Sequence, residues 1–241
     1  MKKLLKGTFI VLYVVLSTQC KETKTQDYHY RYTLPDWPQL NYYVKANSAL
    51  PPPAQNEDRV VFMGNSITQS WKTIRPEFFE GKPYVNRAIS GQTTPQMLVR
   101  FRQDVLALQP QVVAIMAGTN DIAENTGPTT VNRVANNLKS MCEIARANNV
   151  KVILCTVLPA EDYPWQRGKD PKNKIPALNQ ILSTYAQANE VYYLDYFSAL
   201  SNGRNGMDEI YSDDGVHLTI EGYKVLEPMI ENAIEEVLAQ E

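Results

Sequence analysis

Residues 59–68 read Arg-Val-Val-Phe-Met-Gly-Asn-Ser-Ile-Thr, a short apolar run that passes directly into glycine and small polar residues. Residues 111–121 repeat this arrangement as Gln-Val-Val-Ala-Ile-Met-Ala-Gly-Thr-Asn-Asp. Continuous apolar runs of this length, rich in β-branched residues, are typical of strands buried on both faces of a parallel sheet. We therefore expect each run to be a buried strand with polar residues on the loop at its carboxyl end.

The same alternation of short apolar runs and longer amphipathic segments continues to the C-terminus. We expect strands at 59–63, 84–87, 111–116, 150–157 and 191–194, and helices at 95–108, 130–148, 174–188 and after Thr219. Strands that alternate with helices indicate a parallel sheet covered by helices. The sequence thus predicts an α/β domain over residues 58–241.

The first 20 residues have the pattern of an export signal. Three lysines fall within the first six residues, and the apolar stretch from Phe9 to Leu16 is too short to span a bilayer. The residues before Cys20 resemble a bacterial lipoprotein signal, although Gln19 is larger than the residue usual there. We expect an exported protein, periplasmic or on the cell surface, whose membrane contact is a lipid on Cys20. An uncleaved signal anchor is the alternative.

Residues 21–57 are predicted to form a tether followed by an arm that packs on the main domain. The tether is polar with scattered tyrosines, and the arm contains a predicted short helix over 36–49 with Trp37, Leu40 and Val44 on one face. Packing is expected because Trp37 and the neighbouring tyrosines would otherwise be exposed.

Charge and cysteine content narrow the possible functions. The chain has 24 basic and 26 acidic residues, a net charge of −2 and no block of lysine or arginine, so nucleic acid is not expected as a partner. Besides Cys20 there are two cysteines, Cys142 and Cys155. We expect buried free thiols, and leave open a disulfide between them.

A serine and a histidine are the main candidates for catalysis. Loops at the carboxyl ends of parallel strands meet at one crevice, and Ser66 follows the first strand. The chain has two histidines, and because His29 lies in the tether, His217 is the base available to Ser66. Asp214 lies three residues before His217, close enough to hold its ring. Alone, Gly-x-Ser most often caps a helix and Asp-x-x-His most often forms a turn, but together they predict nucleophile, base and orienting carboxylate.

Acyl transfer also requires hydrogen-bond donors for the developing oxyanion. The backbone N–H groups of Ser66 and Gly91 and the side-chain amide of Asn120 are the candidates. Their alternative roles are a tight turn for Gly91 and a loop cap for Asn120.

Four short motifs carry a family resemblance. The motifs at 64–68, 90–94, 118–121 and 214–217, Gly-Asn-Ser-Ile-Thr, Ser-Gly-Gln-Thr-Thr, Gly-Thr-Asn-Asp and Asp-Gly-Val-His, are similar to the sequence blocks of the SGNH (GDSL-like) hydrolases. The resemblance implies a flavodoxin-like three-layer α/β/α sandwich with a five-stranded parallel sheet. It also implies ester hydrolysis through an acyl-enzyme without metal or cofactor, and the oxyanion roles of Ser66, Gly91 and Asn120. Asn65 stands where the family usually has aspartate.

The residues expected around this site indicate the class of substrate. The loop over 159–171 should overhang the site, where Trp165 stacks on a sugar, lines a small acyl pocket or only anchors the loop. Asn65 and Gln92, which adjoin the nucleophile and Gly91, are further candidate substrate contacts. We expect a short-acyl ester, such as acetyl, on a glycan. The alternatives are a lysophospholipase or platelet-activating-factor-acetylhydrolase-like lipid esterase, and a glycan-binding lipoprotein that lacks catalysis.

Overall fold

A computed structural model describes residues 36–240, which belong to one compact unit. The predicted signal over residues 1–20, the lipidation site Cys20 and the tether with His29 lie outside the described residues.

Five parallel strands form the single sheet of this unit. They are β1 (Val60–Gly64), β2 (Tyr84–Asn86), β3 (Val112–Met116), β4 (Lys151–Cys155) and β5 (Tyr192–Leu194). The spatial order is β2-β1-β3-β4-β5, which is the flavodoxin-like order. Every residue of β1 and β3 is buried, as their apolar sequences require. The five predicted strands are confirmed.

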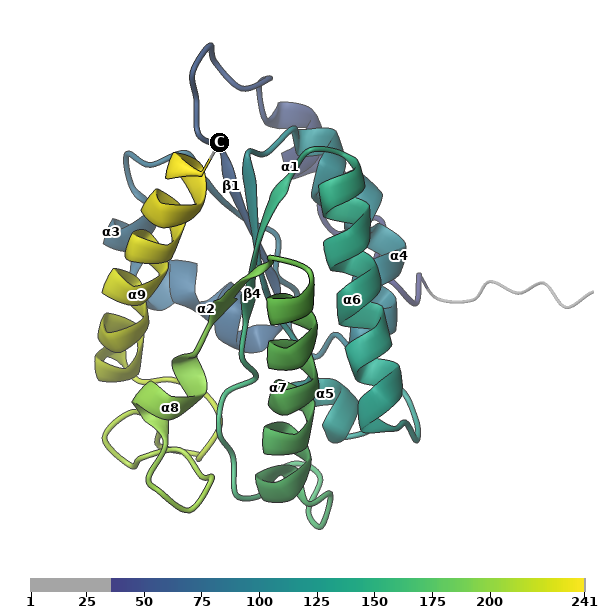
Figure 1. The fold of residues 1–241 in the computed structure, drawn as a ribbon, viewed down its shortest axis with the longest axis vertical. Helices are drawn as coiled ribbons and strands as arrows, with labels where there is room; N and C mark the ends of the chain where they lie inside the picture. Colours follow the sequence, from purple (N-terminus) through teal and green to yellow (C-terminus); the bar gives the residue numbers. More distant parts are fainter. Residues whose placement is uncertain (1–35, 241) are drawn as a thin grey trace, which may run out of the picture. The chain divides into compact units, whose positions relative to one another are not determined.

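Helices cover both faces of the sheet, which makes a three-layer sandwich (Figure 1). In chain order they are α1 (Val44–Ala49), α2 (Ser66–Ile74), α3 (Pro76–Phe79), α4 (Thr94–Asp104), a 3₁₀ turn (Leu106–Leu108), α5 (Thr119–Ile122), α6 (Val131–Ala147), α7 (Pro171–Ala188), α8 (Tyr196–Leu200) and α9 (Ile220–Ala239). Helices α2 and α9 pack on one face, and α6 and α7, with α4 beside α6, cover the other. The predicted α/β fold is confirmed.

The strand order creates a crevice beside β1. From β1 the chain crosses to β2 on one side, and it later returns to β3 on the other side. Loops that leave neighbouring strands in opposite directions open a crevice at the carboxyl ends of those strands. Gly64, the last residue of β1, pairs with Met116, the last residue of β3, so both loops start at the same level.

An aromatic cluster fixes helix α2 to the sheet. The buried Trp71 ring stacks on Phe78, with centroids 4.8 Å apart, and on Tyr223 of α9, at 5.5 Å. The Tyr223 hydroxyl also donates a hydrogen bond of 2.7 Å to the carbonyl of Ile67 in the first turn of α2. The amino end of α2, where Ser66 lies, is therefore held by both packing and hydrogen bonding.

The arm packs on the domain, but not in the predicted way. Only Val44–Ala49 is helical, so the predicted helix over residues 36–49 is wrong for its first part. There the Asp36 carboxylate accepts hydrogen bonds from the N–H groups of Leu40 and Asn41, which favours a turn over a helix. Trp37 remains 44% exposed, and its carbonyl accepts a hydrogen bond from the Gln96 side chain.

Both cysteines of the domain are buried free thiols, as predicted. Burial raises the pKa of Cys142 to about 12, and burial also raises the pKa of Cys155 well above its usual range.

A buried arginine ties α4 to the loop after β2. The Arg100 side chain is fully buried and donates to Gln92 Oε1 at 2.6 Å, to the Arg87 carbonyl at 2.7 Å and to Asp104 Oδ2 at 3.2 Å. Asp104 is also fully buried and accepts a hydrogen bond from Asn47 of the arm. The ion pair therefore links three segments that are distant in sequence.

We expect Arg100→Met to lower the free energy of unfolding by about 3–5 kcal/mol, because it leaves the Asp104 carboxylate buried without a charge partner. Urea unfolding followed by circular dichroism at pH 7 measures the change. Arg102→Met, an exposed position on the same helix, is the control and should stay within about 0.5 kcal/mol of the original protein. Equal losses in the two variants would contradict the structural role of Arg100.

Candidate active site

A tight connection between β1 and α2 places Ser66. Gly64 has no room for a side chain, since a Cβ there would lie 2.2 Å from Thr68 Oγ1 and 3.0 Å from the Met116 carbonyl oxygen. Asn65 caps α2, its Oδ1 accepting a hydrogen bond of 3.1 Å from the Ile67 N–H. Ser66 is thus the first residue of the helix, half-buried at the carboxyl end of β1.

The structure brings the predicted Ser66, His217 and Asp214 into one line of hydrogen bonds. Ser66 Oγ lies 2.9 Å from His217 Nε2, and His217 Nδ1 lies 2.7 Å from Asp214 Oδ2. A proton on Nδ1 that faces the carboxylate leaves Nε2 as the acceptor for the serine hydroxyl. This is the geometry in which an imidazole can take a proton from a serine.

Asp214 also holds the backbone of its own loop. Its Oδ1 accepts hydrogen bonds from the N–H groups of Val216, at 2.8 Å, and His217, at 2.7 Å. Partial burial alone would raise the pKa of Asp214, but the hydrogen bonds from the His217 ring and from these two N–H groups outweigh it and lower the pKa. The carboxylate therefore remains charged beside the imidazole throughout the range in which histidines titrate.

The two predicted oxyanion donors outside the nucleophile loop lie after β2 and β3, the strands on either side of β1. Gln92 N–H donates to the Ile89 carbonyl, which makes a four-residue turn with Gly91 as its third residue, at φ 77°. A turn of this kind favours glycine at that position. Asn120, in the first turn of α5, donates from Nδ2 to the Gln92 carbonyl at 3.0 Å. A second hydrogen on Nδ2 remains for another acceptor.

Gln92 does not face the crevice, so its prediction as a substrate contact is wrong. The side chain is 2% exposed, and its Nε2 donates to the Pro38 carbonyl and to Gln39 Oε1. Its Oε1 accepts from Arg100. Gln92 joins the arm, α4 and the Gly91 turn, a role that depends on partners distant in sequence.

Asn65 also has a structural role, and its predicted contact with substrate stays a prediction. It is 3% exposed, and its side-chain oxygen is used to cap α2. The absence of a carboxylate at this position therefore leaves the line from Ser66 to Asp214 intact.

The loop after β4 reaches the site, as predicted. The Trp165 ring lies 6.0 Å from the His217 ring, tilted by 40°, and stacks on buried Tyr163 at 5.0 Å. Trp165 is 41% exposed, and its Nε1 donates to Asn125 Oδ1 at 3.1 Å. Sequence reasoning missed Asn125, because nothing in the sequence distinguishes it from other loop asparagines.

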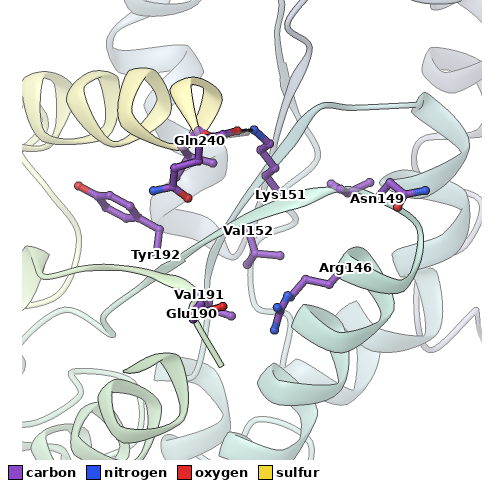
Figure 2. A pocket seen from close by; sticks show the side chains of 10 residues that line it. Arg146, Asn149, Lys151, Val152, Glu190, Val191, Tyr192 and Gln240 are labelled. Carbon is purple, nitrogen blue, oxygen red and sulfur yellow. Dashed lines mark hydrogen bonds between the residues drawn. The ribbon is translucent and has the colours of Figure 1, made fainter. Parts of the chain in front are cut away.

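A separate hollow of about 360 Å³ lies at the opposite end of the sheet, around the amino ends of β4 and β5 (Figure 2). Its lining includes no serine, cysteine or histidine. Lys151, which Figure 2 shows reaching toward Gln240, donates to carbonyl groups in the last turn of α9, including that of Val237 at 3.0 Å. This lysine thus stabilises a helix end, and the hollow lacks the groups for acyl transfer.

Comparison with known proteins identifies relatives of this domain. Residues 62–225 match the GDSL-like Lipase/Acylhydrolase family. A solved structure from Bacteroides fragilis, provisionally assigned as an acylhydrolase, is 47% identical with a TM-score of 0.81, and the match covers 84% of this chain and 98% of that one. A GDSL-like lipase from Bacteroides thetaiotaomicron is 44% identical with a TM-score of 0.80, covering 83% and 98%.

A third relative is an uncharacterized lipoprotein, YqeF, from Bacillus subtilis. It is 36% identical over 95 residues, which is 38% of this chain. The chain spans only 39% of the length of that lipoprotein in the match.

A fluorophosphonate probe, which reacts with activated serines, should label Ser66. The rate of labelling should fall as the pH drops from about 8 to 5, because an imidazole accepts the serine proton only when it is neutral. Since the pKa of Asp214 is lowered, its protonation should add no second step in this pH range. Mass spectrometry of the labelled peptide measures the rate. Ser66→Ala should abolish labelling, whereas Ser70→Ala on the same helix should not; a pH-independent rate would exclude His217 as the base.

Proposed function

The chain belongs to the GDSL-like lipase/acylhydrolase family, a family of carboxylic ester hydrolases, and we propose on this basis that it is a serine esterase with Ser66 as its nucleophile. The observation that carries the proposal is the hydrogen-bonded line from Ser66 through His217 to Asp214, with distances of 2.9 and 2.7 Å.

In the proposed first half-reaction, Ser66 Oγ attacks the carbonyl carbon of an ester while His217 Nε2 accepts the hydroxyl proton. The carbonyl oxygen becomes an oxyanion, which accepts hydrogen bonds from the N–H groups of Ser66 and Gly91 and from Asn120 Nδ2. The tetrahedral intermediate then collapses, the imidazolium returns the proton to the leaving alcohol, and the acyl group stays on Ser66.

The second half-reaction requires water beside the same histidine. The side chains of His217 and Asp214 are 42% and 39% exposed, so solvent reaches the imidazole directly. His217 takes a proton from that water, the resulting hydroxide attacks the acyl-enzyme, and the acid leaves as Ser66 recovers its proton.

We favour a short acyl group, such as acetyl, on a glycan. The exposed face of Trp165 beside His217 suits stacking on a sugar ring. A neighbouring hollow of about 290 Å³, which Asp214 and Gly215 border, is lined mainly by charged and polar residues, including Asp162, Arg167 and Asn202. Such a lining fits a hydroxylated alcohol better than an acyl tail.

One observation favours the lipid alternative. Ile210 and Ile220 are 61% and 49% exposed, and they flank the loop that carries His217. Exposed apolar side chains near an active site would suit contact with a lysophospholipid or a bilayer.

The substrate proposal is tested by measuring acid release from acetylated xylo-oligosaccharide, lysophosphatidylcholine, p-nitrophenyl acetate and p-nitrophenyl decanoate. We expect acetate release from the oligosaccharide and at least ~10-fold preference for the acetate over the decanoate in kcat/KM. Ser66→Ala should lower turnover by about 10⁴-fold or more, with Ser70→Ala as the matched control. Fatty-acid release from the lysophospholipid alone would support the lipid alternative, and binding of glycan without turnover of any ester would indicate the non-enzymatic one.

We further propose that the protein is exported and carries a lipid on Cys20. The sequence before Cys20 and the relative named as a lipoprotein support this. No helix within residues 36–240 combines the length and apolar character needed to cross a bilayer.

In a bacterial host that processes lipoproteins, the protein should sediment with membranes, and Cys20→Ala should shift most of it to the soluble fraction because the acyl chains are lost. Immunoblots of the two fractions measure this. A Cys20→Ala protein that stays in the membrane would instead indicate an uncleaved signal anchor.

A further inference from the structure

Asn125, in the loop after α5, connects Trp165 to both of the proposed oxyanion residues outside the nucleophile loop. Its Oδ1 accepts the hydrogen bond of 3.1 Å from Trp165 Nε1. Its Nδ2 donates to Asn120 Oδ1 at 3.0 Å and to the Gly91 carbonyl at 3.3 Å. Asn120 Nδ2 in turn donates to the Gln92 carbonyl at 3.0 Å. Three loops therefore meet at one side-chain amide.

The direction of this chain of hydrogen bonds is fixed at both ends. An indole N–H can only donate and a backbone carbonyl can only accept. The Trp165 N–H therefore requires the oxygen of Asn125, which turns the Asn125 nitrogen toward Asn120 and Gly91. The Gln92 carbonyl requires the nitrogen of Asn120, which turns the Asn120 oxygen toward Asn125. The two amides are mutually consistent in this one orientation only.

We propose that Asn125 is a positioning residue that, held by the Trp165 indole, keeps a free N–H of Asn120 directed at the oxyanion. The inference rests on the proposed esterase function and deepens it. A side-chain amide has nearly the same shape after a 180° turn, so packing alone does not choose between its two ends. In the reversed orientation the Asn120 oxygen would face the developing negative charge and oppose it. The Gln92 carbonyl and Asn125 together oppose this reversal, the first by accepting from the Asn120 nitrogen and the second by donating to its oxygen.

The proposal predicts an effect on the chemical step and not on substrate binding. The oxyanion exists in the transition state and not in the ester itself, so loss of the amide orientation should lower kcat and leave KM nearly unchanged. If Asn125 only held the loop near Trp165, the effect of removing it would be the same whether or not the Asn120 amide is present.

The same loop offers a matched control. Lys169 pairs with Glu124 at 2.6 Å, which attaches the loop over 159–170 to the residue next to Asn125 without involving either amide. Lys169→Ala removes this second attachment and leaves the chain of amides intact.

The experiment measures kcat and KM with p-nitrophenyl acetate for Asn125→Ala, Trp165→Phe and Lys169→Ala, each alone and combined with Asn120→Ala. We expect Asn125→Ala to lower kcat about 10-fold and Trp165→Phe, which keeps an aromatic side chain but loses the N–H, about 3-fold, from the usual strength of one hydrogen bond. In the Asn120→Ala background, itself lowered by about 10²–10³, neither change should have a further effect. Lys169→Ala should leave kcat unchanged in both backgrounds.

Losses from Asn125→Ala that are equal with and without Asn120 would overturn the proposal, as would a loss confined to KM or an equal loss from Lys169→Ala. Trp165→Phe keeps the inference testable if Asn125→Ala proves too unstable to purify. Failure of the esterase proposal would give a different result. An unchanged rate in Ser66→Ala would contradict the esterase proposal, whereas the comparison with Asn120→Ala tests only the role of Asn125.

Discussion

The site depends on the absence of a side chain at Gly64. Because β1 and β3 end in register, with Gly64 opposite Met116, Gly64 lies between Thr68 in the first turn of α2 and the end of the neighbouring strand. A Cβ at this position would collide with Thr68 of α2 and press on the Met116 carbonyl. This close approach places Ser66 above the crevice at which the strand order reverses, and the loops after β2 and β3 then lie around it.

Rigidity on the oxyanion side comes from a buried polar network, not from apolar packing alone. Arg100 lies below the Gly91 turn and binds Gln92 and Asp104, while the arm supplies carbonyl groups and an asparagine to the same network. Buried charges and amides must find partners in specific geometry, so such a network permits few arrangements of the loop it supports. The arm is thus part of the support of the active site, although it contributes no reacting group.

Much of the fold was predictable because it follows from local patterns. Continuous apolar runs gave β1 and β3, and the spacing of Asp214 and His217 allowed one carboxylate to reach both the ring and the backbone of its own loop. Tertiary partners determined what the sequence did not reveal. Gln92 adjoins Gly91, yet its side chain turns away from the crevice because Arg100 and Pro38 lie behind it. Asn125 gains its importance from Trp165, 40 residues further along the chain. The turn at Asp36 displaced a helix that periodicity alone had favoured.

The two buried thiols have a consequence for how the protein can be observed. Disulfide exchange and alkylation proceed through the thiolate, and burial raises the pKa of Cys142 to about 12 and that of Cys155 further still. In the folded protein both thiols therefore stay protonated at neutral pH and do not undergo these reactions. Cys142 becomes accessible to solvent when α6 leaves the sheet, and Cys155 when the opposite face of β4, which contacts Tyr196, opens. The rates at which Cys142 and Cys155 are alkylated thus report how often each face of the central sheet becomes open to solvent.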